Sequence, residues 1–106
     1  MPRTELTQLF RDDARRQLSI LAENGEWTRI VRLAEDLLIA RRRLATFPEL
    51  GRELLADEDH SLRLLLLGQV PYLIWYRLDR RADAVRFVRL FHTHQQTPKP
   101  RMWLRV

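Results

Sequence analysis

The chain has 106 residues, 45% of them apolar, and carries 19 Lys and Arg against 14 Asp and Glu. This length suits one compact domain, and the apolar content excludes an intrinsically disordered chain. No uninterrupted apolar run approaches the roughly 20 residues of a membrane helix, so no membrane segment is expected. The absence of cysteine excludes disulfides and thiolate metal sites, and it suits a reducing cytoplasm.

The charge is unevenly distributed along the chain. Residues 1–76 carry 11 basic and 12 acidic groups, whereas residues 77–106 carry 8 basic and 2 acidic groups, a net charge of +6. A basic C-terminal region commonly faces an acidic partner, either a nucleic acid or an acidic protein. The alternative is an arginine-rich surface that only contacts water, and both interpretations stay open at this point.

The first half of the chain predicts two amphipathic helices. Apolar residues recur at helical spacing over residues 10–22, and Asn24-Gly25 ends this helix because both residues tolerate a left-handed backbone. A second apolar stripe runs from Trp27 to Ala45, with Asp36 among the charged residues expected on its solvent side, and Pro48 prevents continuation. Two such helices joined by a tight turn form an antiparallel hairpin.

The second half changes to the patterns of β-strands. Residues 62–67 predict a short strand buried on both faces, residues 72–78 a strand rich in aromatic and β-branched side chains, and residues 84–91 the returning strand. Residues 4–9 fit either a first edge strand or a lead into the first helix. From residue 92 onward we expect an extended tail unless it docks. The fold class is therefore α+β, with the helix hairpin packed in a second layer on a small antiparallel sheet.

Sequence motifs offer little support for a metal or cofactor site. His92 and His94 are one residue apart and would share a face of a strand, but a zinc site needs a third ligand. There is no glycine-rich phosphate loop and no motif of a serine hydrolase or zinc protease. We therefore expect neither a metal nor a cofactor. Any catalysis would depend on Arg, His and Tyr, and RNA cleavage is the natural case.

Two arginines interrupt the apolar strands. Alternation puts Arg77 on the same face as Trp75, and an arginine aimed into a core is costly. This face is therefore expected to be open or to bind a partner, with Trp75 exposed on it. Alternatively, Arg77 and Arg89 lie at a sheet edge and pair with Asp79 or Asp83.

Three segments in this order resemble the ParE/RelE superfamily of toxins from bacterial type II toxin–antitoxin modules. They are Phe47–Arg52, Val70–Asp79 and Val85–His92, and the likeness covers roughly residues 10–98. The resemblance implies the same two-layer fold, with a toxin domain over residues 1–98 and a basic tail over residues 99–106.

The resemblance leaves two mechanisms open. RelE-like members cut messenger RNA on the ribosome with basic residues on the central strands, whereas ParE-like members inhibit DNA gyrase and are not nucleases. Three strand positions that are basic in the nucleases correspond here to Leu64, Leu66 and Leu73, which fits ParE better. A third interpretation is a degenerate member that has kept only an interaction surface. If the chain is RelE-like, its catalytic candidates are Arg63, Arg77, Arg89, His92 and His94.

The resemblance also implies a cognate antitoxin, which would lay an amphipathic helix and an extended segment across the toxin. The residues expected to contact the antitoxin are Trp27, Ile30, Leu37, Trp75 and Arg77. An exposed apolar patch would also let the free chain form a homodimer. For gyrase, the target of the ParE-like interpretation, the expected contacts lie in the basic C-terminal stretch: Arg89, His92, Arg101 and Trp103.

Overall fold

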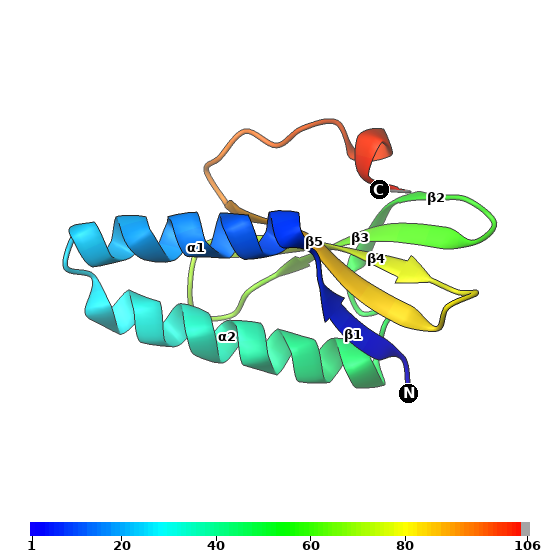
Figure 1. Cartoon of the computed structure of the whole chain (residues 1–106), viewed down its shortest axis with the longest axis horizontal. Coiled ribbons are helices and arrows are strands. Elements are labelled where there is room, and N and C mark those ends of the chain that lie inside the picture. Colours follow the sequence, from blue (N-terminus) through cyan, green and yellow to red (C-terminus); the bar gives the residue numbers. More distant parts are fainter. Residues whose placement is uncertain (105–106) are drawn as a thin grey trace.

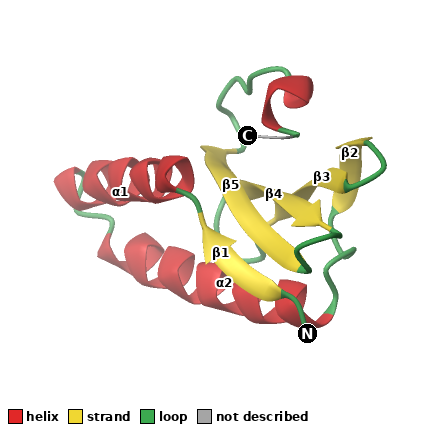
Figure 2. Ribbon diagram, turned by 45° about the vertical axis from the view of Figure 1, so that its right-hand side comes forward, coloured by secondary structure: helices red, strands yellow, loops and turns green. Residues whose placement is uncertain are grey.

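The computed structural model describes residues 1–104 and contains a helix hairpin packed on a five-stranded sheet (Figures 1 and 2). The elements in chain order are β1 (Arg3–Leu6), α1 (Gln8–Glu23), α2 (Trp27–Thr46), β2 (Arg52–Ala56), β3 (His60–Leu66), β4 (Tyr72–Asp79), β5 (Ala84–His92) and the short 3₁₀ helix η1 (Pro100–Trp103). The strand order is β1-β5-β4-β3-β2, with β1 parallel to β5 and the other pairs antiparallel. The expected α+β two-layer class is confirmed.

Both predicted helices are present, and local chemistry sets their ends. The hydroxyl of Thr7 accepts a hydrogen bond from the backbone N–H of Phe10 (3.2 Å) and so caps the start of α1. Gly25 has a φ of +67° in the turn between the helices, which is the left-handed conformation that glycine adopts without strain. α2 ends at Thr46, two residues before Pro48, as expected.

The buried face of α2 differs from the one predicted. Its buried side chains are those of Leu33, Asp36, Ala40 and Leu44, whereas Val31 and Leu38 of the predicted apolar stripe are exposed. The expectation that Asp36 faces solvent is wrong. Its carboxylate accepts hydrogen bonds from the backbone N–H (2.7 Å) and the side-chain amide (2.9 Å) of Gln69, in the loop between β3 and β4. These hydrogen bonds hold the side of α2 that carries Asp36 against the loop between β3 and β4.

The main core lies between the helices and one face of the sheet. On β4, Tyr72, Ile74 and Tyr76 point toward the helices, where Leu33 and Phe87 are among the residues that pack with them. The Tyr76 hydroxyl donates to the carbonyl of Pro48 and accepts from the N–H of Gly51, both at 2.8 Å. A side chain at Gly51 would lie 2.7 Å from Tyr76 and from a backbone oxygen of β3, so this approach requires glycine.

One edge of the sheet decides between the two interpretations of residues 4–9, and the other edge contains a strand that the sequence did not predict. Residues 3–6 form an edge strand parallel to β5, with α1 beginning immediately afterwards. The strand β2 has no counterpart among the sequence-based predictions. It is only five residues long and contains a bulge between Glu53 and Leu55. The predicted burial of both faces of β3 is wrong at its end, because Leu66 is 63% exposed.

The second face of the sheet is covered by the chain's own C-terminal segment, defined here as residues 100–104. Leu104 packs in a second apolar cluster with Leu62, Leu73, Trp75 and Phe91. The expectation that Trp75 is exposed is therefore wrong, since its side chain is only 2% exposed. The tail docks rather than extending freely, as Figures 1 and 2 show, and its last two residues, 105 and 106, lie outside the described part of the chain. Within that part, neither helix has the length and apolarity to cross a membrane.

Candidate functional site

Arg89 links three parts of the molecule on the second face of the sheet. Its Nε and Nη2 donate to the carboxylate of Asp13 in α1 at 2.7 and 3.1 Å. The same carboxylate accepts a hydrogen bond from the backbone N–H of Leu90 (3.0 Å) and is only 2% exposed. The guanidinium carbon of Arg89 lies 4.8 Å from the ring centre of Phe91 and 4.9 Å from that of Trp103. The cation therefore joins helix, sheet and C-terminal segment through charge-assisted and cation–π contacts.

The four residues expected to contact gyrase lie at different depths. Arg89 is engaged as just described, and Trp103 is half-buried against it. Arg101 is exposed on the C-terminal segment. The ring of His92 packs edge-on against Tyr72 at 5.1 Å, and its pKa is lowered by burial, with further contributions from His94 and Arg29. The structure brings Arg89 and Trp103 together, whereas His92 lies toward the helix side of the sheet.

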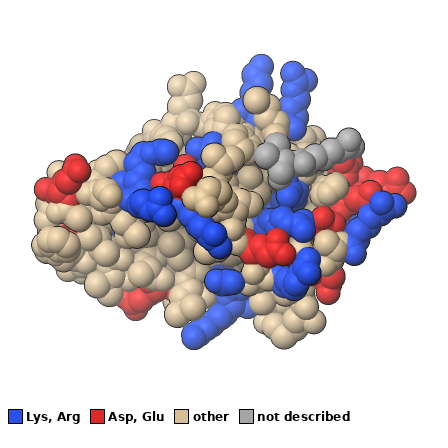
Figure 3. All heavy atoms as spheres, viewed as in Figure 1, with Lys and Arg blue, Asp and Glu red and all other residues tan. Residues whose placement is uncertain are grey.

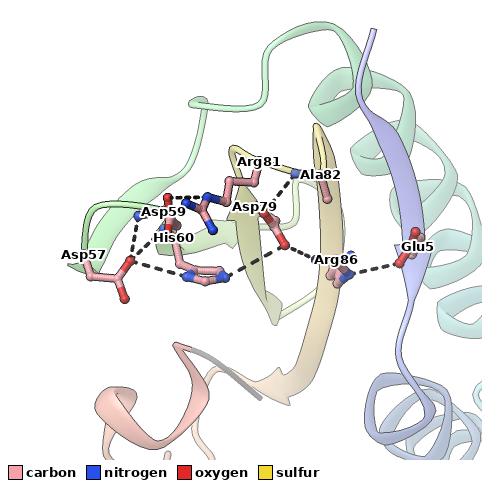
Figure 4. A network of polar contacts seen from close by, with 8 residues as sticks. All are labelled: Glu5, Asp57, Asp59, His60, Asp79, Arg81, Ala82 and Arg86. Carbon is pink, nitrogen blue, oxygen red and sulfur yellow. Dashed lines mark hydrogen bonds and ion pairs between the residues drawn. The ribbon is translucent and has the colours of Figure 1, made fainter.

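A row of alternating charges crosses the far end of the second face (Figure 4). Arg86 of β5 bridges Glu5 of β1 (3.0 Å) and Asp79 of β4 (2.7 Å), while His60 lies between Asp79 (3.9 Å) and Asp57 (3.3 Å). The hydrogen bond from Arg86 is the main reason why the pKa of Asp79 is lowered, and the same bond raises the pKa of Arg86. Arg86, the arginine of this row, is thus matched by two carboxylates.

Arg77 lies on the second face opposite Arg86 in the β4–β5 ladder. Its side chain is largely buried, so the expectation that it is presented on an open surface is wrong. Burial lowers its pKa, and the neighbouring charge of Arg86 adds to this effect. Of the predicted alternatives for the two arginines, pairing with an acidic residue holds for Arg89, but its partner is Asp13 rather than Asp79 or Asp83.

The five residues proposed for RNA cleavage do not converge. Arg63 points to the helix side of the sheet, where its guanidinium donates to the carbonyls of Glu49 (3.0 Å) and Gly51 (2.8 Å). Arg77 and Arg89 lie on the other face, and His92 and His94 lie at one end of β5 with ring centres 5.3 Å apart. Asp13, which holds Arg89, was not among the predicted site residues. Its only signal in the sequence was a carboxylate within a predicted helix.

The helix layer contains an apolar groove of about 490 Å³ between α1 and α2. Three arginines border it, and its apolar lining comes from β1, both helices and β5. The lining residues are Leu6, Phe10, Ala14, Leu18, Leu37, Leu38 and Phe87, with Arg11, Arg15 and Arg41 at the border. Among the residues expected to contact an antitoxin, Leu37 lines this groove, Trp27 is 64% exposed and Ile30 is half-buried. The other two, Trp75 and Arg77, lie on the opposite side of the sheet.

The described surface offers contact areas rather than a gathered set of reactive groups. No three His, Asp or Glu side chains in residues 1–104 come close enough together to hold a metal ion. Figure 3 shows that cations and anions are interspersed over the strand half of the visible face, whereas the helix-hairpin end carries few charges. This arrangement suits binding of a protein partner through apolar contacts with charged margins.

Comparison with known families confirms the resemblance seen in the sequence. Residues 4–97 match the family described as the ParE toxin of a type II toxin–antitoxin system, parDE. The match covers both helices, strands β2 to β5 and all of β1 except Arg3, and it ends before the C-terminal segment. No curated protein matches the sequence significantly.

Proposed function

Because the chain belongs to the ParE toxin family of type II toxin–antitoxin systems, we propose that it inhibits DNA gyrase through surface contact. Gyrase inhibition is the general property of ParE toxins. The observation that carries the proposal is the separation of the basic residues that a RelE-like nuclease would need. Arg63 lies on one face of the sheet and bonds backbone carbonyls, while Arg89 lies on the other face and bonds Asp13.

The test is supercoiling of relaxed plasmid by purified gyrase and ATP, with increasing amounts of the folded toxin freed from its antitoxin. We expect loss of supercoiled product, or linear DNA after treatment with detergent and protease. Unimpaired supercoiling would contradict the proposal. The RelE-like alternative would then be tested on ribosome-bound messenger RNA, where the double variant Arg77→Ala/His92→Ala should lose cleavage.

We place the gyrase contact in the basic C-terminal stretch. The support is chemical: an indole flanked by cations can anchor in a pocket, as aromatic and arginine residues do at interface hot spots. The proposed contacts are Arg89, His92, Arg101 and Trp103. Deleting residues 99–106 should abolish gyrase inhibition, while circular dichroism checks that the domain stays folded. Undiminished inhibition by the truncated chain would exclude the tail from target binding.

A ParE toxin has a cognate antitoxin as its partner, and we propose that this antitoxin covers the helix hairpin. The apolar groove with its arginine border suits an amphipathic helix with acidic margins, and the charge of +5 suits an acidic partner. The proposed contacts are Trp27, Ile30 and Leu37, together with Leu38, which lines the groove and is 51% exposed. Trp75 and Arg77 are buried on the other side of the sheet and become contacts only if the antitoxin also reaches that face. The homodimer stays a prediction.

The antitoxin surface can be tested with matched variants of exposed residues. Leu38→Asp and Trp27→Ala should each weaken binding of the co-expressed antitoxin, measured by calorimetry with the purified proteins. Arg81→Ala is the control, because its side chain is 83% exposed in the turn after β4, away from the groove. Equal affinity of all three variants would contradict a contact on the hairpin.

A further inference from the structure

The C-terminal segment covers an apolar surface that the helices do not reach. The side chains of Leu62, Leu73, Trp75 and Phe91 form this surface on the second face of the sheet, and Leu104 packs into it. Trp103 lies at its border against the guanidinium of Arg89. In Figures 1 and 2 the segment reaches this place from the end of β5 through a long loop rather than through regular structure.

In the docked segment, Trp103 is packed against Arg89, so two residues proposed for target binding contact each other. The indole of Trp103 lies on Arg89, and Arg89 in turn is held by the buried carboxylate of Asp13. An aromatic anchor that is packed against its own domain cannot at the same time fill a pocket on another protein. In this conformation two of the four proposed gyrase contacts are thus engaged within the chain.

The C-terminal segment is held by few contacts, and two buried hydrogen-bond donors at these contacts lack an acceptor within residues 1–104. The indole nitrogens of Trp75 and Trp103 are buried, and neither has a hydrogen-bond acceptor among the described residues. A buried donor without an acceptor opposes burial, because it gives up its bond to water. The connecting residues 93–99 are mostly exposed and contain no helix or strand. Such a segment belongs to the part of a protein that opens locally at low free energy.

We infer that the C-terminal segment is a releasable cover, clamped through Arg89, and that it must lift for Trp103 and Arg89 to bind the target. The inference rests on the proposed function, since the target is taken to be gyrase. Asp13 is a positioning residue in this scheme: it orients Arg89, which holds the indole. A toxin of this kind exists in a closed state, with Trp103 on the sheet, and an open state that binds gyrase.

The closed state can be tested on the free protein by fluorine NMR after incorporation of 5-fluorotryptophan. The chain has three tryptophans, and each is assigned by its Trp→Phe variant. Trp27 is an internal exposed reference at 64% exposure, and Trp75 is the buried reference. We expect the signal of Trp103 to show a clearly smaller shift between H₂O and D₂O than that of Trp27. A shift equal to that of Trp27 would overturn the inference.

Release is tested with Leu104→Ser, which removes the apolar anchor and leaves Asp13, Arg89 and Trp103 unchanged. The solvent shifts of Trp75 and Trp103 should both increase, whereas Met102→Ser should behave as wild type because Met102 is already 65% exposed. Arg89→Gln is a second variant, because it removes the cation that packs against Trp103 and leaves the length of the segment unchanged. If the segment stays docked in both variants, it is not a releasable cover.

The consequence for the target is measured by gyrase supercoiling with the same proteins. If the closed state holds nine-tenths of the wild-type molecules, Leu104→Ser should inhibit gyrase at about tenfold lower concentration. Met102→Ser should match wild type. Release of the segment in Leu104→Ser without a gain in potency would overturn the inference, while inhibition by wild type would still support the proposed function. If no variant inhibits gyrase, the proposed function fails and the target-binding role of the segment fails with it, whereas the fluorine spectra still decide whether the segment docks.

Discussion

The two faces of the sheet are covered in different ways. Among residues 1–104, the helix-covered face has 13 buried residues in one apolar cluster, contributed mainly by both helices and by strands. Of the same described residues, the second face has five in its cluster, and one of these, Leu104, comes from the short C-terminal segment. One cover is therefore part of the fold's main core, while the other is a small attachment with few contacts. The comparison teaches that burial of a side chain does not by itself make it part of the stable core.

The largest expected effect concerns the helix-covered face. Phe87 is buried there and packs edge-on against Phe10 with ring centres 5.3 Å apart. Phe87→Ala should lower the free energy of unfolding by about 3–5 kcal/mol, measured by urea denaturation. Leu104→Ala should lower it far less, because the C-terminal segment can leave while the main core stays intact. Equal losses in the two variants would show that both covers belong to one cooperative unit.

Asp13 of α1 bonds Arg89 on the second face, and its substitution should cause the next largest loss in the free energy of unfolding. Asp13→Asn removes a buried charge that accepts two bonds from Arg89 and one from the backbone of β5. We expect a loss of about 2–3 kcal/mol in the free energy of unfolding. Asp12→Asn is the matched control, because that neighbouring side chain is exposed and should change stability by less than about 0.5 kcal/mol. If Asp12→Asn lowers the free energy of unfolding as much, the effect comes from a change in α1 and not from the loss of the bonds between Asp13 and Arg89.

A smaller effect is expected where the helix-covered core meets the loop after α2. Tyr76→Phe leaves the Pro48 carbonyl and the Gly51 N–H without their partner, which should cost about 1–3 kcal/mol in thermal or urea unfolding. Tyr72→Phe serves as control, because the Tyr72 hydroxyl has no hydrogen bond with any described residue. A larger loss in Tyr72→Phe than in Tyr76→Phe would be the contrary result.

The smallest effect concerns pH and the charged row on the second face. The pKa of Asp79 is lowered, chiefly by the hydrogen bond from Arg86, so the folded state binds its proton less readily than the unfolded state does. The resulting stability is present above about pH 4, the pKa of an unfolded aspartate, and is lost as the pH falls through the lower folded pKa. Asp79→Asn should therefore be less stable than wild type at pH 7, with a difference that narrows in acid. Asp83→Asn, which changes an exposed neighbouring residue, is the control, and urea unfolding of each protein is measured at pH 7 and in acid.

Local patterns predicted the elements whose causes are local. Gly25 and Pro48 mark the helix ends, and the aromatic run of β4 identifies the central strand. Features that depend on distant partners were missed. The buried side of α2 is set by the bonds of Asp36 with Gln69, 33 residues away, and the burial of Trp75 depends on the C-terminal segment, where Leu104 packs in the same cluster. The site followed the same rule: Arg89 was identified as a candidate, but its partner Asp13 is 76 positions earlier in the sequence.

The parallel pairing of β1 with β5 has a consequence for the synthesis of this protein. Residues 3–6 pair with residues 84–87, so β1 cannot pair with its partner until the ribosome has synthesised β5. Contacts between residues so far apart raise the contact order and slow folding relative to a helical bundle of this size. A nascent chain that ends before residue 84 can form its helix hairpin, but it lacks the strand that connects β1 to the rest of the sheet. The apolar side of that hairpin then stays uncovered, and such incomplete chains are prone to aggregate.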